Sequence, residues 1–199
     1  YHLDEGGSPV QLCMTNPDVL ALTKTKLSQE SAQKPNARYW DISQMDGWPG
    51  TCCPDCQAIN DYEESPMGSI LQFINQVAAD FPDLYIGTLA YVWSRPPPKY
   101  TQPADNVAIK LCDIECQRTS AAVPIATGAE HALFREDFDD WATTCQHLII
   151  WDYVIQFSNL VSPYPNLRTL QPNMQYFHSK NIEGIFSQGN REIGGEFCE

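Results

Sequence analysis

The chain has 199 residues and a mass of 22.4 kDa, with 25 acidic against 12 basic residues and a formal net charge of −13. Hydrophobic residues make up 43% of it, enough to offset the conformational entropy lost on folding, which excludes a disordered chain. The negative charge argues against nucleic acid as a partner, and no apolar run reaches the roughly 18 residues that a membrane span needs.

Helix and strand patterns alternate along the chain. Asn16-Pro17-Asp18 predicts a helix start, because proline is tolerated in the first helical turn, and this helix continues to about Ser31. Apolar residues at helical spacing predict further helices over residues 66–81, 133–144 and 166–180, the last one bent or broken near Pro172. Strands are predicted over residues 38–43, 84–92, 106–114, 148–153 and 182–187.

This alternation predicts an α/β fold with a parallel sheet. An open doubly wound sheet has no positive support, because no Gly-x-Gly-x-x-Gly follows the first strand. A barrel is favoured, because parallel strands place their C-terminal ends on one face, and nearly every predicted strand ends in a polar or aromatic residue. These residues are Gln44, Asp46, Tyr91, Trp93, Asp113, Glu115, Asp152, Tyr153 and Gln188.

A complete eight-stranded barrel takes about 250 residues, and only five strands are predicted here. We therefore expect residues 1–199 to form one partial domain with the C-terminal five strands of a (β/α)8 TIM-like barrel, the upstream strands being absent from this segment.

Eight cysteines are spread along the chain: Cys13, Cys52, Cys53, Cys56, Cys112, Cys116, Cys145 and Cys198. An even and high number is typical of secreted or cell-surface proteins, so we expect most of them to form disulfides, in a pairing that the sequence does not define. Cys52-Cys53-x-x-Cys56 also resembles half of a zinc-binding pattern, but a second pair at ligand spacing is absent. No metal and no other cofactor is therefore expected.

The strand that ends near residue 114 carries the strongest indication of catalysis. An apolar row that finishes in two carboxylates is expected where a barrel interior opens into a site, and two close acids raise one pKa and so provide a general acid. The alternative is that both acids simply leave the strand into solvent. Strand alternation places on one face Val107, Ile109, Leu111, Asp113 and Glu115.

Other strand ends offer groups suited to holding a sugar. Asp152 lies between Trp151 and Tyr153, whose rings provide stacking faces, although aromatic residues are equally common in a core. Gln44 and Asp46 follow the first strand, where they serve equally well as turn formers.

Seven short motifs, in collinear order over most of the chain, resemble glycoside hydrolase family 163, a bacterial family first described as a domain of unknown function. They are Cys13-Met-Thr-Asn-Pro-Asp-Val19, Ile42-Ser-Gln-Met-Asp-Gly47 with Cys53-Pro-Asp-Cys56, Ser65-Pro-Met-Gly-Ser69 with Leu71-Gln-Phe-Ile-Asn75, Thr88-Leu-Ala-Tyr91, Leu111-Cys-Asp-Ile-Glu-Cys116, Ile150-Trp-Asp-Tyr153 and Gly184-Ile-Phe-Ser-Gln-Gly189.

The resemblance implies a TIM-like barrel that hydrolyses β-linked N-acetylglucosamine in glycans. It implies a retaining reaction in which the substrate's own 2-acetamido group attacks the anomeric carbon. Glu115 is then expected to be the acid/base and Asp113 the group that orients the acetamide. The residues expected to hold the sugar are Gln44, Asp46, Tyr91, Trp151, Asp152 and Tyr153.

Two functions remain open at this point. The first is a secreted glycoside hydrolase that acts on glycans or glycoproteins. The second is a non-catalytic extracellular module, structural or glycan-binding, built on the same barrel within a larger chain or assembly. Met45, which stands where a polar residue is expected in the first strand-end motif, and the abundant cysteines motivate the second.

Overall fold

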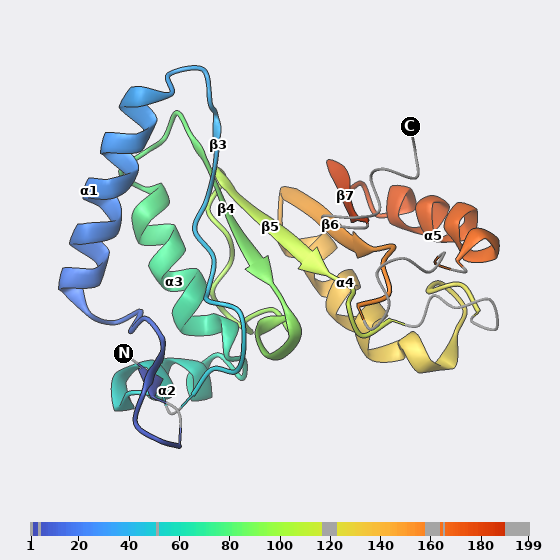
Figure 1. The fold of residues 1–199 in the computed structure, drawn as a ribbon, viewed down its shortest axis with the longest axis horizontal. Helices are drawn as coiled ribbons and strands as arrows, with labels where there is room; N and C mark the ends of the chain where they lie inside the picture. The colour runs from blue at the N-terminus through green and yellow to red at the C-terminus, as the bar shows by residue number, and fades with distance from the viewer. Residues whose placement is uncertain are drawn as a thin grey trace.

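The computed structural model describes residues 2–3, 5–50, 52–116, 123–157, 164 and 166–189. It is a mixed α/β structure built on one curled, parallel sheet that forms a half-barrel (Figure 1). The five strands lie in chain order: β3 (Tyr39–Asp41), β4 (Tyr85–Ala90), β5 (Val107–Cys112), β6 (His147–Tyr153) and β7 (Gly184–Gln188). A two-stranded antiparallel sheet, β1 (His2–Leu3) with β2 (Pro9–Gln11), precedes them.

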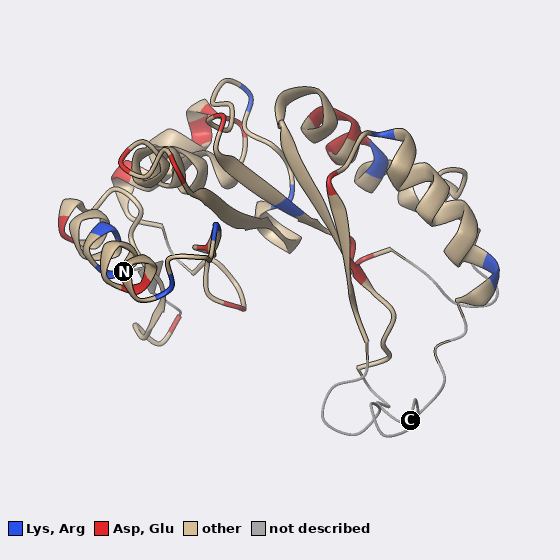
Figure 2. Ribbon diagram, turned by 90° about the horizontal axis from the view of Figure 1, so that it is seen from above, with Lys and Arg blue, Asp and Glu red and all other residues tan. Residues whose placement is uncertain are grey.

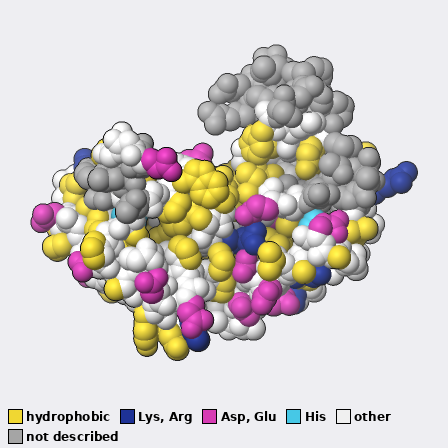
Figure 3. Space-filling model, turned by 90° about the horizontal axis from the view of Figure 1, so that it is seen from below, with side chains coloured by type: hydrophobic (Ala, Val, Ile, Leu, Met, Phe, Trp, Pro, Cys, Tyr) yellow, Lys and Arg dark blue, Asp and Glu magenta, His cyan; other side chains and the backbone are white. Residues whose placement is uncertain are grey.

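Helices cover the outer side of the curl (Figure 2). They are α1 (Pro17–Gln33), α2 (Pro54–Tyr62), α3 (Met67–Ala78), α4 (Ala132–Thr144) and α5 (Leu167–Ser179), with short 3-10 turns at Val92–Ser94 and Ala129–His131. Within the described residues, no helix has the length and hydrophobicity needed to cross a bilayer. In the view from below (Figure 3), acidic side chains are scattered among hydrophobic ones and basic side chains are few.

The predicted elements are largely confirmed. Asn16 caps α1 as predicted, because its Oδ1 accepts hydrogen bonds from the backbone N–H groups of Asp18 at 2.8 Å and Val19 at 3.2 Å. Helix α5 was expected to be bent or broken near Pro172. It is not broken, because α5 continues through Pro172. Helix α2 was not predicted: Cys53 caps it by accepting a hydrogen bond from the Cys56 backbone N–H, and Pro54 begins it.

The main core lies between the sheet and the helices. Val107, Ile109 and Leu111 of β5 pack there with side chains of α3 and with Phe138 and Trp141 of α4. The expectation that this row lines the barrel interior is therefore wrong. The physical reason is that both faces of a central parallel strand are apolar, so alternation alone does not tell the helix side from the inner side.

The opposite row faces the inside of the curl, which we call the concave face. Residues in register across a parallel sheet share a face, and Leu89 is opposite Lys110, which is opposite Ile149. At the start of the strands the two edges of the sheet are tied together across this face, because the Tyr39 hydroxyl donates a 2.7 Å hydrogen bond to Glu183 Oε2. His147 bonds the other oxygen of Glu183 at 2.5 Å.

Glu63, directly after α2, is a buried carboxylate with several donors. Its Oε2 accepts hydrogen bonds from the backbone N–H groups of Tyr100 at 2.8 Å and Thr101 at 3.0 Å, and its Oε1 accepts one from the Thr101 hydroxyl. Burial opposes ionisation, but the bonds from Thr101 and Tyr100 outweigh it and lower the pKa of Glu63 below its usual 4.5.

Replacing Glu63 with glutamine is expected to lower the free energy of unfolding by about 2 kcal/mol at pH 7, because the amide loses charge-assisted bonds and turns donors toward donors. The pKa of Glu63 is lower in the folded than in the unfolded state. The stability difference between Glu63→Gln and the parent is therefore fully present above about pH 4.5, and it disappears as the pH falls through the folded-state pKa. Urea unfolding at several pH values measures it. The neighbouring exposed Glu64→Gln is the control, expected within about 0.5 kcal/mol of the parent. A difference that grows in acid contradicts the assignment.

Candidate functional site

A cavity of about 510 Å³ opens on the concave face at the C-terminal ends of the strands. Its volume falls in the range of small-molecule sites. Three strands, β4, β6 and β7, and the segments that follow β3, β4 and β5 contribute to it, as expected when parallel strands end at a common rim. Its lining residues are Gln44, Asp46, Leu89, Tyr91, Ile114, Trp151, Tyr153, Phe157 and Gln188.

One wall of this cavity is aromatic. The ring of Trp151 lies 4.6 Å from that of Phe186, edge to face, and 6.3 Å from that of Tyr153, nearly parallel to it. The Trp151 indole N–H donates a 2.9 Å hydrogen bond to Gln188 Oε1, which fixes the ring's orientation. A fixed indole that lines a cavity is a suitable stacking surface for a ring-shaped ligand.

The polar groups come from the β3 and β4 ends. Tyr91 and Asp46 both line the cavity, and burial, followed by the nearby charge of Asp46, raises the pKa of Tyr91. The loop that places Asp46 turns at Gly47, whose φ of +110° favours glycine, and the Gly47 N–H donates to Asp46 Oδ1 at 2.9 Å.

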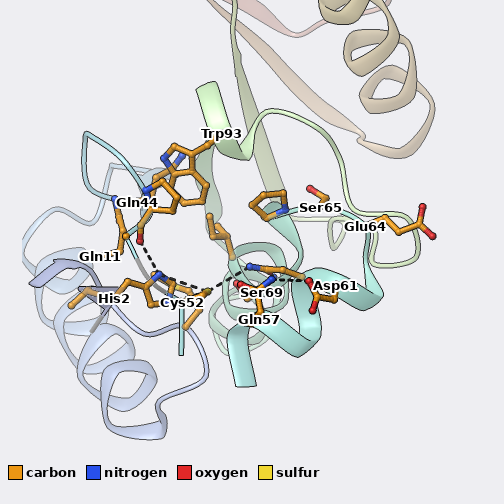
Figure 4. A pocket seen from close by; sticks show the side chains of 17 residues that line it. His2, Gln11, Gln44, Cys52, Gln57, Asp61, Glu64, Ser65, Ser69 and Trp93 are labelled. Carbon is orange, nitrogen blue, oxygen red and sulfur yellow. Dashed lines mark hydrogen bonds between the residues drawn. The ribbon is translucent and has the colours of Figure 1, made fainter. Parts of the chain in front are cut away.

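Gln44 lies between this cavity and a second one of about 420 Å³ near the chain's beginning, and it lines both. Its Nε2 donates a 2.6 Å hydrogen bond to Ser94 Oγ. Its Oε1 is buried and has no hydrogen-bond partner among the described residues. A buried carbonyl oxygen of this kind is suited to accept a hydrogen bond from a ligand. Figure 4 shows Gln44 beside the second cavity.

Glu115 does not line the larger cavity, although its neighbour Ile114 does. Its Oε2 lies 3.0 Å from Arg95 Nη1, and Arg95 also holds Asp137 of α4 through a 2.6 Å bond from Nε. The Glu115 side chain is 41% exposed, against 12% for Arg95. No motif or spacing in the sequence singles out Arg95, which precedes three prolines.

Asp113 and Asp152 do not line the cavity either. Like Val107, Ile109 and Leu111, they are on the helix side of the sheet and not on its concave face. Both lie in the row that faces the helices, and both are buried. The backbone N–H of Asp113 continues the sheet by donating to the Trp151 carbonyl at 3.2 Å. The residues that the structure does bring together at the cavity are Gln44, Asp46, Tyr91, Trp151 and Tyr153 from the predicted site, and Gln188 from the predicted strand ends.

The expected disulfides are not found among the described cysteines. Cys13, Cys52, Cys53, Cys56, Cys112, Cys116 and Cys145 are all free thiols, and Cys198 lies outside the described residues. Cys112 and Cys116 are buried separately, and Cys13, Cys53 and Cys56 approach one another without bonding.

Fold and site together define an α/β half-barrel protein with a ligand-sized cavity at the C-terminal ends of its strands. Over residues 1–199 the chain matches the family model described as a domain of unknown function, DUF4838, and it belongs to that family. No curated protein and no solved structure matches it significantly.

Proposed function

We propose that this protein is a secreted glycoside hydrolase that acts on glycans containing β-linked N-acetylglucosamine. The observation that carries the proposal is the cavity on the concave face, with its fixed Trp151 ring and its Asp46–Tyr91 pair. Sugar sites combine aromatic faces, which stack on the apolar side of the ring, with carboxylates and amides for the hydroxyl groups.

The finer fold assignment belongs to the same proposal. Five parallel strands in chain order, helices on the outer side and a cavity at the C-terminal strand ends agree with part of a (β/α)8 TIM-like barrel.

In the proposed reaction the substrate's acetamido oxygen attacks the anomeric carbon while the bond from that carbon to the leaving oxygen breaks. Glu115 donates a proton to the leaving oxygen and later accepts one from the water that opens the cyclic intermediate. Glu115 is next to the cavity, because its neighbour Ile114 lines it. In the structure the Glu115 carboxylate is paired with Arg95, so this ion pair has to break for the carboxylate to reach the substrate. Asp46, which faces the cavity, is better placed than the buried Asp113 to orient the acetamide.

One observation favours a second candidate, a glycan-binding module without catalysis. Glu115 is held by Arg95 and stays outside the cavity lining, whereas the groups suited to binding lie in it. Both candidates require glycan binding at the same cavity, and only the first requires turnover.

Trp151→Ala is expected to weaken the binding of an N-acetylglucosamine oligosaccharide at least about 5-fold, because stacking on an aromatic ring contributes on the order of 1 kcal/mol or more. Isothermal titration with the oligosaccharide measures this. Trp48→Ala removes an indole that is 75% exposed and lines neither cavity, and it is expected to leave binding unchanged. Failure of the parent protein to bind the oligosaccharide, or equal binding by both variants, contradicts the proposal.

A further inference from the structure

Three thiols and one imidazole lie close together near the N-terminal end of the molecule, outside the lining of the proposed sugar cavity. His2 lies in β1, Cys13 follows β2, and Cys53 and Cys56 lie at the start of α2. Cys13 Sγ is 3.3 Å from Cys53 Sγ and 3.8 Å from Cys56 Sγ. Ligand atoms of His2, Cys53 and Cys56 all lie within 4.8 Å of one another. Segments about forty to fifty residues apart thus meet at one point.

These separations fit a shared metal ion better than a disulfide. In a tetrahedral zinc site, with Zn–S bonds of about 2.3 Å and a Zn–N bond of about 2.05 Å, two sulfurs lie about 3.8 Å apart and a sulfur and a nitrogen about 3.6 Å apart. A disulfide requires about 2.05 Å and joins only two sulfurs. Cys13 instead approaches two sulfurs at once, at distances close to the edges of a tetrahedron.

The groups around the cluster are those that support a metal site. His2 Nδ1 lies 3.2 Å from the Pro49 carbonyl oxygen, which can only accept a hydrogen bond, so the proton is on Nδ1 and the Nε2 lone pair is left for a ligand. The Thr15 hydroxyl lies 3.3 to 3.5 Å from the sulfurs of Cys13, Cys53 and Cys56. The Cys56 backbone N–H donates to Cys53 Sγ at 3.4 Å. Donors of this kind stabilise thiolates.

We propose that Cys13, Cys53, Cys56 and His2 bind one Zn²⁺ ion in a closed structural site. Three thiolates and a neutral imidazole are ligands that zinc favours, and four protein ligands leave no position open for a substrate. Binding changes no oxidation state: each thiol loses a proton as its sulfur joins the metal, so up to three protons are released. The ion would hold the β1–β2 pair against α2.

The site also forms part of a cavity wall. His2 and Cys52 line the cavity of about 420 Å³, and Figure 4 shows their side chains next to each other. Cys52 Sγ lies 3.5 Å from His2 Nε2, and it accepts a hydrogen bond from Asn60 Nδ2 at 3.7 Å. Cys52 is therefore the competitor of His2 for the fourth ligand position, and the experiment has to separate the two.

The first test uses the 199-residue chain purified with a reductant, given Zn²⁺ and then dialysed. Elemental analysis is expected to find about one zinc per chain, and substitution by Co²⁺ is expected to give the intense absorption of tetrahedral thiolate ligation. Thiol titration of the folded protein is expected to detect about three more reactive cysteines after a chelator is added. Absence of bound zinc, or a native disulfide between Cys13 and either Cys53 or Cys56, overturns the proposal.

The second test assigns the ligands. Cys13→Ser, Cys53→Ser, Cys56→Ser and His2→Gln are each expected to lower zinc affinity at least about 100-fold. Cys52→Ser and the remote Cys145→Ser are the matched controls and are expected to keep one zinc per chain. Loss of zinc in Cys52→Ser together with retention in His2→Gln overturns the assignment of His2. The measurements on the unaltered chain decide the existence of the site even where a variant fails to fold.

Discussion

Replacing Glu115 with glutamine is expected to lower the turnover of a glycan with β-linked N-acetylglucosamine at least about 100-fold, while oligosaccharide binding stays within about twofold of the parent. The amide keeps the shape of the side chain but is too weak an acid to protonate the leaving oxygen and too weak a base to deprotonate the water. Binding is preserved because the groups proposed to hold the sugar line the cavity and are unchanged in this variant. Chromatographic analysis of released glycan measures turnover, and titration measures binding.

Glu136→Gln is the matched control, because Glu136 is an exposed glutamate of α4 that lines neither cavity. It is expected to leave turnover unchanged. If Glu115→Gln and the control have equal turnover, Glu115 is not the acid/base. A parent protein that binds the oligosaccharide without cleaving it supports the non-catalytic module instead.

Trp141→Ala is expected to lower the free energy of unfolding by about 3 to 5 kcal/mol. Trp141 is fully buried in the core between β5 and α4, so its truncation leaves a cavity. Its indole N–H also donates a 2.8 Å hydrogen bond to the backbone carbonyl of Arg95, the residue that holds Glu115. Chemical unfolding followed by circular dichroism measures the loss.

The surface tryptophan Trp48 is again the comparison, because Trp48→Ala is expected to change stability by no more than about 0.5 kcal/mol. A Trp141→Ala variant as stable as the Trp48→Ala variant contradicts the packing described for α4. Activity in the Trp141→Ala variant should fall further than its folded fraction accounts for, because the Arg95 carbonyl loses its partner.

The sheet and most helices were predictable because their patterns are long and periodic. Helix α2 was not, since cysteine is an unusual N-cap and its apolar residues are few. The strands β1 and β2, of two and three residues, are too short to leave a pattern. Pairing in them depends on contacts between segments, such as Gln11 with Met45, that no local rule predicts.

The position of the site was predictable where it depends only on the direction of the strands. Trp151, Tyr153 and Tyr91 reach the cavity because parallel strands end at one rim. Asp113 and Asp152 were misplaced because both rows of β5 and β6 are largely apolar in the sequence, so the sequence does not show which row faces the inside of the curl. The cluster of Cys13 with Cys53 and Cys56 was missed because its members come from distant segments.

The hydrogen bond from Tyr39 of β3 to Glu183, directly before β7, joins the two edges of the sheet at the N-terminal ends of the strands. A tilt of the edge strands about that end would keep this tie intact. Over a lever arm of about 20 Å, roughly the length of a six-residue strand, a tilt of about 3° displaces the far rim by about 1 Å. A tilt of this size would widen the rim of the cavity by about 1 Å while the tethered end stays in register.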